Sequence, residues 1–415
     1  MKIHRTIPPA AAPIDMKSLF HGLAGIFLSK KYMKKVEDEL RDYFGVKYIF
    51  LVSSGKAALT IILRALKSLS PEKSRVLIPA YTCFSVPSAI TRAGLRVSLC
   101  DVDPRTLNFD HDLLENCAQK EDTLCVIATH LFGLPSDMEK MNNFGKRNAL
   151  FIVEDAAQAM GGKQGEKLLG SLGDVGFFSL GRGKNITCGS GGIIVTDSDN
   201  IAREIKHELG RIEDMSLAET LKEFIKVLIM SIFIRPSLYW FPSGLSFLKL
   251  GETVYDADFP MRKFSGMQAG LLAGWQRRLE ESNEVRARNV SYLTAGLNLP
   301  RRPLTPVPYL RLPVLVESRE TRENVDALSL RKGLGISRMY PAPINRIDEI
   351  RDQFKETGFP RASEVAERLR TLPTHQLVSE KDIETICRCF ENGQNAFNVQ
   401  QFPERRKRFL NKWSI

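Results

Sequence analysis

The sequence lacks the features that identify a membrane-spanning or a secreted protein. The uncharged, mostly apolar run between Lys226 and Arg235 has only eight residues, whereas about 20 are needed to cross a bilayer. The N-terminus carries prolines, among them Pro8 and Pro9, where a signal peptide would need its apolar segment. We therefore expect a cytoplasmic protein, with a peripheral position at the inner face of the membrane as the alternative.

The spacing of the cysteines does not indicate a metal site. No C-x-x-C pair occurs, and Cys387-x-Cys389 has no second cluster with which to complete a set of ligands. Several of the seven cysteines stand in apolar, strand-like runs, where cysteine behaves as a small hydrophobic residue. We expect no metal ion, and the cysteine usage fits a reducing compartment.

A concentrated basic surface of the kind that binds nucleic acid is also missing. The net charge is +11, but the basic residues are dispersed except in the run Arg405–Arg408. This charge favours anionic partners such as nucleotides, phosphates or anionic lipid head groups. With 43% hydrophobic and 26% charged residues, the 415-residue chain has the composition of a globular protein of two or three domains.

Short apolar runs bounded by turn residues alternate with helical patterns through the first half of the chain. The predicted strands are residues 48–54, runs near Val76 and Val97, and runs ending at His130, Asp155 and Asp197. This alternation predicts an α/β fold with a mainly parallel sheet flanked by helices. Ligands of such sheets gather at the carboxyl ends of the strands.

Two of these strand ends carry residues suited to an anionic, aromatic ligand. After the first strand, Ser54 and Gly55 make a turn into a helix whose free N–H groups form an anion cup, although an ordinary capped helix start has the same pattern. Asp155 ends a buried strand, where a carboxylate needs a cation or a strong donor, such as a protonated ring nitrogen. The alternative for Asp155 is the N-cap of a following helix.

Lys184 lies in the glycine-rich stretch Phe177–Gly192. A lysine that acts covalently needs a lowered pKa, a carbonyl to attack and room for the adduct. The glycines supply the room, but a solvated surface lysine fits the same loop. His130, which follows an apolar strand, is better explained as a structural residue than as a catalyst.

A series of motifs runs in order from about Val36 to Cys389. The segments are S-G-K-A-A-L, P-A-Y-T, D-V-D-P-R-T-L-N-F-D, H-L-F-G-L-P-S-D-M, E-D-A-A-Q-A-M-G-G, L-G-S-L-G-D-V-G-F-F-S-L, F-S-G-M-Q-A-G-L-L-A, Y-P-A-P-I and L-P-T-H-Q-L-V-S-E-K-D-I. Together they resemble the sugar aminotransferase family named for DegT, DnrJ and StrS. This resemblance implies pyridoxal 5′-phosphate as cofactor and the fold of aspartate aminotransferase, fold type I, with a smaller α+β C-terminal domain.

The resemblance also assigns roles by position. It implies that Lys184 bonds to the cofactor aldehyde and moves the proton during transfer, that Asp155 pairs with the pyridine nitrogen, and that Gln158 contacts the ring hydroxyl. The other residues assigned to the cofactor are Gly55, Lys56, Ala57 and Ser179 around the phosphate and Phe84 beside the ring. Arg338 and Tyr340 are candidates for substrate binding.

The implied reaction moves an amino group from an amino acid, glutamate in the family, to a nucleotide-linked keto-sugar for polysaccharide, lipopolysaccharide or related glycan synthesis. The family is usually homodimeric. Alternatives are a pyridoxal-phosphate-dependent sugar dehydratase, an amino-acid transaminase, and a non-catalytic relative that binds a sugar nucleotide. Some relatives carry His at the lysine position and act as dehydratases, so Lys184 argues against that branch.

The chain departs from the family pattern at several positions. Lys56 stands where Thr is frequent, Cys83 where a stacking aromatic is frequent, and Ser190 where Glu is frequent. The common Asn-Tyr-Arg is replaced by Pro260-Met261-Arg262. In relatives that Asn reaches the cofactor phosphate of the neighbouring subunit, so we expect this contact to be lost or replaced here.

The predicted organisation has an N-terminal arm (1–30), a large cofactor-binding domain (31–280), a small C-terminal domain (281–397) and a basic tail (398–415). The large domain contains an apolar insertion at about 211–258, centred on residues 224–242. A helix buried against the core or a dimer partner is the favoured interpretation of this segment. The competing interpretation is an interfacial membrane helix, prompted by the flanking Lys226 and Arg235, by Tyr239-Trp240 and by the basic tail.

Overall fold

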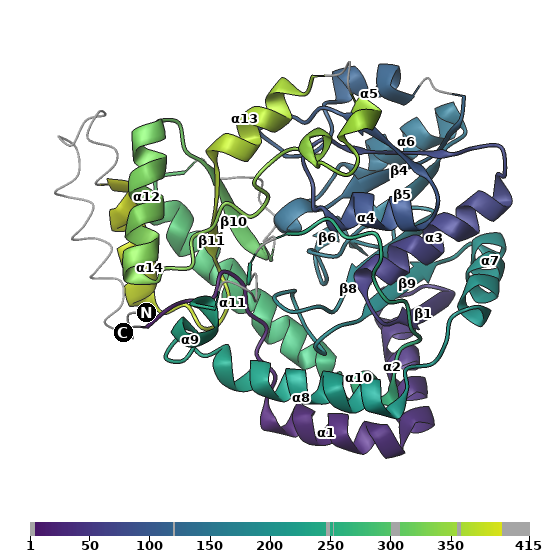
Figure 1. Ribbon diagram of the computed structural model, residues 1–415, viewed down its shortest axis with the longest axis horizontal. Helices are drawn as coiled ribbons and strands as arrows, with labels where there is room; N and C mark the ends of the chain where they lie inside the picture. Colours follow the sequence, from purple (N-terminus) through teal and green to yellow (C-terminus); the bar gives the residue numbers. More distant parts are fainter. Residues whose placement is uncertain are drawn as a thin grey trace.

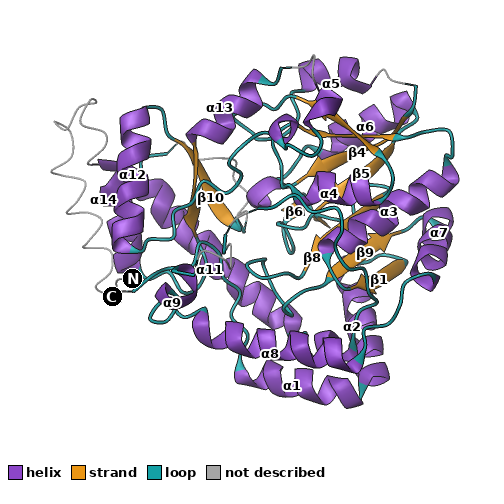
Figure 2. Ribbon diagram, viewed as in Figure 1, coloured by secondary structure: helices purple, strands orange, loops and turns teal. Residues whose placement is uncertain are grey.

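The structure, a computed structural model, describes residues 5–118, 121–245, 250–251, 253–299, 308–354 and 358–391. The predicted basic tail, with Arg405–Arg408, lies outside these residues. A seven-stranded sheet forms the centre of the larger part of the molecule and is covered by helices (Figures 1 and 2). The predicted α/β fold class is confirmed.

The sheet has the strand order β1-β9-β8-β5-β4-β2-β3. The strands are β1 Tyr48–Val52, β2 Arg75–Pro79, β3 Arg96–Cys100, β4 Thr123–Thr129, β5 Phe151–Asp155, β8 Val175–Ser179 and β9 Gly192–Thr196. Neighbouring strands from β8 to β3 are parallel, whereas β9 is antiparallel to both β1 and β8. Because β1, β5 and β8 therefore run in one direction, the residues that follow them meet at one edge of the sheet.

Alternating side chains of the strands supply two cores. Ile78 and Val153 point to one face, which is covered by helices α3 (Gly55–Leu69), α4 (Ser85–Arg92) and α7 (Asp199–Gly210). Leu77 and Ile152 point to the other face. The helices there are α2 (Ser29–Phe44), α5 (His111–Ala118), α6 (Met138–Asn148) and α10 (Gly266–Leu271). Burial on both faces explains why these strands are nearly continuous apolar runs.

The C-terminal part is smaller and is built on the long helix α11 (Trp275–Gly296). Its two strands, β10 (Arg311–Leu315) and β11 (Leu369–Pro373), pair antiparallel. The helices α12 (Arg319–Lys332), α13 (Pro360–Arg368) and α14 (Glu380–Glu391) complete this α+β unit. The residue limits predicted for the domains stay a prediction.

Both outer segments of the chain for which expectations were stated contain helices. Residues 1–30, expected as an arm, contain helix α1 (Met16–Phe27), which packs on α10. The apolar insertion forms helices α8 (Leu217–Phe233) and α9 (Trp240–Ser243). Helix α8 packs one face on the core through Val227 and leaves its other face exposed, so the expected burial against the core or a dimer partner stays a prediction for that exposed face. Within the described residues, no helix is both long enough and apolar enough to cross a membrane.

Candidate active site

The predicted anion cup lies at the N-terminus of α3, which begins at Gly55. Ser54 caps the helix, since its hydroxyl accepts a hydrogen bond from the Ala57 amide at 3.1 Å. This bond satisfies the amide of Ala57, whereas Gly55 and Lys56 have first-turn amides that a helix leaves for an outside partner. Gly55 lies against Ser179 at the end of β8, and a Cβ on Gly55 would be 2.8 Å from the Ser179 Cβ. Two of the residues predicted to hold a phosphate are therefore in contact.

The side chain of Lys56 turns away from this cup to a neighbouring segment. Its Nζ is 3.1 Å from an oxygen of Asp256 and 4.2 Å from the ring centre of Phe259. The lysine that replaces the frequent threonine is thus held by an ion pair and a cation–π contact. Its backbone amide, and not its ammonium group, is the part of Lys56 that faces the cup.

Adjacent carboxylates at the end of β5 point to opposite sides of the sheet. Glu154 is fully buried and accepts hydrogen bonds from the amides of Gly170, Leu172 and Gly173. It also accepts from His130 Nε2 at 2.7 Å, because the Ser136 amide donates to the other ring nitrogen of His130. His130 is therefore fully hydrogen-bonded, as expected for a structural residue.

Asp155 faces the cup side of the sheet and is only 6% exposed. Among the described residues, the one hydrogen-bond donor to its carboxylate is the Ala157 amide, at 3.0 Å. Burial raises the pKa of Asp155, while this hydrogen bond and the nearby Lys184 act in the opposite direction. A buried carboxylate with spare acceptor capacity is suited to a protonated nitrogen of a ligand.

Lys184 lies in the turn that joins β8 to β9, beside Asp155. The turn is attached to helix α11, since Asn185 donates to Asn283 at 3.2 Å and Arg286 donates to the Lys184 carbonyl at 3.5 Å. Burial lowers the pKa of Lys184, and Arg311 lowers it further, against the opposing effects of Cys83 and Asp155. A lowered pKa increases the neutral fraction of the amine near pH 7, which is the nucleophilic and proton-accepting form.

Gln158 and Tyr340 meet in the same region although they come from different parts of the chain. The Gln158 amide nitrogen donates to the Tyr340 hydroxyl at 2.9 Å, and its oxygen accepts from the Phe132 amide at 3.2 Å. The Tyr340 ring stacks on Phe132 and meets Tyr81 edge-on, each at 5.8 Å between ring centres. Burial raises the pKa of Tyr340 well above its usual value, so its hydroxyl stays protonated as a donor.

Cys83, the residue before Phe84, acts electrostatically on Lys184. Its thiol affects the pKa of both Lys184 and Tyr340 and lies 3.8 Å from the Thr253 hydroxyl. Phe84 is buried in the main core at the start of α4. Its predicted contact with a ligand ring stays a prediction.

Arg311 is a residue of this region that the sequence reasoning did not single out. It is only 6% exposed, its Nη1 donates to the Ser337 hydroxyl at 2.8 Å, and its Nε has no hydrogen-bond partner. No carboxylate within the described chain pairs with it. Burial lowers the pKa of Arg311 to about 10, against the influence of Tyr340 and Tyr239. The signal was available, because an arginine in the apolar run Y-L-R-L-P-V-L-V requires a partner.

Arg286, one layer behind, has a structural explanation. It is fully buried and donates to the carbonyls of Ala11, Leu310 and Lys184. These bonds join the N-terminal segment, strand β10 and the lysine turn. The buried basic groups here are Lys184, Arg286 and Arg311, whereas Asp155 is the carboxylate that acts on Lys184. The resulting excess of positive charge favours an anionic ligand.

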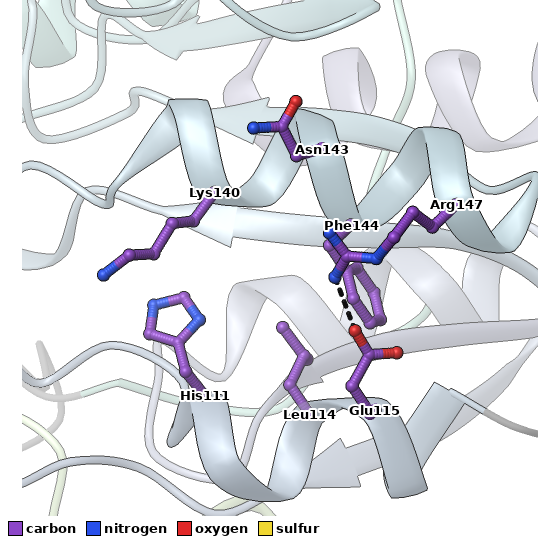
Figure 3. Close-up of a pocket in the computed structure, with 7 residues that line it drawn as sticks. All are labelled: His111, Leu114, Glu115, Lys140, Asn143, Phe144 and Arg147. Atoms are coloured by element: carbon purple, nitrogen blue, oxygen red, sulfur yellow. Dashed lines mark hydrogen bonds and ion pairs between the residues drawn. The ribbon is translucent and has the colours of Figure 1, made fainter.

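Arg338, the other predicted substrate residue, does not join this cluster. It binds Asp326 at 2.7 Å, together with Arg370, and lines a surface cavity of about 750 Å³ beside α12 and α13. A second surface cavity, of about 230 Å³, lies between α5 and α6 (Figure 3). It is lined by His111, Lys140 and the ion pair of Arg147 with Glu115, and contains none of the predicted site residues.

Comparison with known sequences identifies matches over most of the chain. The sequence model of the DegT/DnrJ/EryC1/StrS aminotransferase family matches residues 23–225 and 257–391. GDP-perosamine synthase of Caulobacter vibrioides is 34% identical over 176 residues, which are 42% of this chain and 47% of the relative. GDP-4-keto-6-deoxy-D-mannose 3-dehydratase of Yersinia pseudotuberculosis is 30% identical over 182 residues, 43% of this chain and 46% of the relative. The chain thus spans about half the length of these curated relatives.

A solved structure shows the same fold over nearly the whole length. Helicobacter pylori PseC, an aminotransferase involved in the biosynthesis of pseudoaminic acid, superposes with a TM-score of 0.75 at 15% identity. The superposition covers 94% of this chain and 100% of that one.

Proposed function

The chain belongs to the DegT/DnrJ/EryC1/StrS aminotransferase family, and we propose that it moves an amino group from an amino acid to a nucleotide-linked keto-sugar with pyridoxal 5′-phosphate as cofactor. The observation that carries the proposal is the position of Lys184, whose pKa is lowered by burial, beside the buried Asp155 and at the sheet edge that holds the α3 cup. When bound, pyridoxal phosphate supplies an aldehyde that bonds to amines and a protonated ring that accepts electrons.

The described residues fit this cofactor. Asp155 would hold the ring nitrogen through the carboxylate oxygen that the Ala157 amide leaves free. The amides of Gly55 and Lys56 and the Ser179 hydroxyl would hold the phosphate, because the close approach of Gly55 to Ser179 brings these donors together. Gln158 has a second amide hydrogen besides the one given to Tyr340, which is available for the ring hydroxyl.

Lys184 would act as the acid and base of the transfer. A neutral amine accepts a proton from the substrate carbon, and the resulting ammonium returns it to the cofactor side. The lowered pKa keeps both forms accessible near neutral pH. The attachment of the turn to α11 through Asn185 and Arg286 holds the lysine backbone in place while the side chain moves.

Arg311 would bind the carboxylate of the amino-acid donor. It offers a free Nε from a buried position, and its charge is not compensated by a carboxylate in the described part of the chain. Guanidinium–carboxylate pairs are strong when both groups are desolvated and hydrogen-bonded. The proposal is supported by the charge of Arg311, which lowers the pKa of Lys184.

The proposed pathway role is the synthesis of a surface polysaccharide, lipopolysaccharide or related glycan, by a homodimer. It is supported by the names of the relatives, which include a perosamine synthase and an aminotransferase of pseudoaminic acid biosynthesis. A dehydratase is also among the relatives. Lys184 favours amino transfer over dehydration, since histidine-bearing relatives are the dehydratases.

The test supplies the cofactor-loaded protein with ¹⁵N-glutamate and a panel of nucleotide-linked 4-keto- and 3-keto-sugars, and follows the sugar by mass spectrometry. We expect ¹⁵N in the sugar and 2-oxoglutarate in equal amount. Loss of water from the sugar without nitrogen gain would establish the dehydratase instead. A protein that binds sugar nucleotide but never responds to any amino donor would be the non-catalytic relative.

A further inference from the structure

Helices α1 and α8 run side by side along one side of the molecule (Figure 1). Both helices expose rows of large apolar side chains. The α1 row follows helical spacing and consists of Met16, Phe20, Leu23 and Phe27, with Leu28 after the helix end. The α8 row consists of Leu217, Leu221, Ile225, Leu228, Ile229 and Ile232. Their exposed fractions range from 39% for Leu228 to 82% for Phe27. We call these eleven residues the α1/α8 apolar surface.

Helix α1 buries small residues and exposes most of its large apolar ones, the reverse of an ordinary amphipathic helix. It turns its small residues Gly22 and Gly25 to the protein, where Gly25 meets the backbone of Gly266 on α10 so closely that a Cβ would lie 2.1 Å from the carbonyl oxygen. The phenylalanines and the methionine therefore point outward. Helices that pack through small residues and expose large apolar ones are typical of proteins in a lipid environment.

Part of this surface lies outside the segments that the family model matches. The family match stops at residue 225 and resumes at 257, so the second half of α8 and the whole of α9 lie between the matched segments. Phe224, Val227 and Met230 pack against the core and fix the rotation of α8. Val227 touches Gly189 of the lysine turn, where a Cβ would lie 2.3 Å from it.

The charges around the α1/α8 apolar surface are mostly positive. Residues 16–36 contain five lysines and no acidic residue, and Lys30, Lys31, Lys34 and Lys35 are exposed on α2. On α8, Glu223 is paired with Lys226, and Glu219 is occupied by the helix cap and Arg262. Lys222 and Arg235 add further exposed positive charge.

We propose that the α1/α8 apolar surface binds the anionic surface of a lipid bilayer, with both helices lying in the interfacial plane and the lysines of α2 contacting lipid head groups. Apolar side chains flanked by lysines are the combination that such surfaces recognise. A second copy of this chain is a poorer partner, because a symmetric contact would place the lysines of the two copies near one another.

The experiment is sedimentation of the full chain, loaded with pyridoxal phosphate, with vesicles of phosphatidylglycerol and phosphatidylethanolamine or with vesicles of phosphatidylcholine alone. We expect binding to the anionic vesicles and little to the neutral ones. The double variant Phe27→Asp, Ile229→Asp removes apolar contacts at two exposed positions and should weaken binding at least about tenfold. The triple variant Lys30→Glu, Lys31→Glu, Lys34→Glu should weaken it by a similar factor.

The matched control is Leu330→Asp, since Leu330 is 83% exposed on α12, away from this surface. It should leave vesicle binding unchanged. Light scattering on every variant gives the oligomeric state. The proposal is overturned if the wild-type chain binds neither vesicle, if it binds both equally, or if the double variant turns a dimer into a monomer. These outcomes are independent of whether amino transfer occurs.

Discussion

At the scale of single residues, the chemistry of the site depends on ionisable groups that burial has moved from their ordinary behaviour. Lys184 has a lowered pKa and Asp155 a raised one, and both shifts are caused mainly by desolvation. Each group also opposes the other's shift, because the ammonium and the carboxylate attract. The pair is thereby suited to the proposed roles, a reactive amine at Lys184 and an acceptor for a ligand nitrogen at Asp155.

Replacing Lys184 by alanine should remove both the covalent attachment and the acid–base catalyst. We expect the visible absorbance of the cofactor-loaded protein to change to that of non-covalently bound cofactor, and kcat to fall by more than about 100-fold. Absorbance spectra and turnover with glutamate measure the two effects. Lys163→Ala, at an exposed lysine, is the control and should change neither. Retention of the wild-type spectrum in the Lys184 variant would contradict the assignment.

Replacing Arg311 by glutamine should change the KM values of the two substrates to different extents. Loss of a buried charge-assisted contact with the donor carboxylate should raise the KM for glutamate by about tenfold or more, with a smaller effect on the KM for the keto-sugar. Arg311→Lys should recover part of the loss because it keeps the charge. Steady-state kinetics with each substrate varied in turn gives the comparison. Equal increases in both KM values would mean that Arg311 only supports the local structure through Ser337.

At the scale of elements, the contact of α1 with α10 depends on the absence of side chains. The Gly25 Cα faces the backbone of Gly266, and Gly270 in turn faces the carbonyl of His21. Both helices are short, so their positions rest on this packing more than on helix propensity. The lysine turn and the middle of α8 also approach closely at a glycine, since a Cβ on Gly189 would lie 2.3 Å from the Val227 side chain.

Gly25→Ala should therefore destabilise the protein by about 1–3 kcal/mol, because its methyl group would overlap the Gly266 carbonyl. Urea unfolding measures the change in the free energy of unfolding. Gly210→Ala is the matched control, since nothing lies within 4 Å of a Cβ at that position. That control should be neutral or stabilise by up to about 1 kcal/mol. Equal effects of the two substitutions would show that α1 can shift to make room.

At the scale of the whole molecule, buried polar groups join the N-terminal segment to the C-terminal part. His375, at the end of β11, donates through Nε2 to the Pro8 carbonyl at 2.8 Å and accepts from the Leu377 amide. Burial lowers the pKa of His375 to about 3, and the nearby Arg286 lowers it as well. The folded state therefore requires the neutral form of the His375 ring.

The stability of the fold should accordingly fall with acid. Between the unfolded pKa of about 6.5 and the folded value, the unfolded chain binds the His375 proton and the native protein does not. Stability is therefore lost as the pH falls below about 6.5, by about 1.4 kcal/mol per pH unit from this residue. Urea unfolding at about pH 7.5 and about pH 5 should show a smaller loss in His375→Asn than in the wild type. The same loss in both proteins would contradict this origin.

The α/β class and much of the site could be predicted from the sequence, because they have local signatures. A strand end followed by Ser54-Gly55, a carboxylate at the end of an apolar run and a lysine among glycines are each encoded by neighbouring residues. Strand β8 is not among the strands predicted from the sequence, since its last residues overlap the glycine-rich stretch Phe177–Gly192. The fold nevertheless follows from the remaining strands, whose apolar runs are long enough to require burial on both faces.

Other features were decided only by the tertiary structure, because they join segments distant in sequence. Tyr340 contacts Gln158, whereas Arg338, two residues earlier, binds Asp326. The two side chains point to different places because Met339 between them has a positive φ of 60°, which breaks the regular alternation of side chains. Arg311 acts on Lys184 only because the segment before β10 meets the lysine turn, where Asn185 donates to the Pro308 carbonyl. Likewise, the pattern of α1 does not say which face is outward, and the close approach of α10 selects the glycines for the inside.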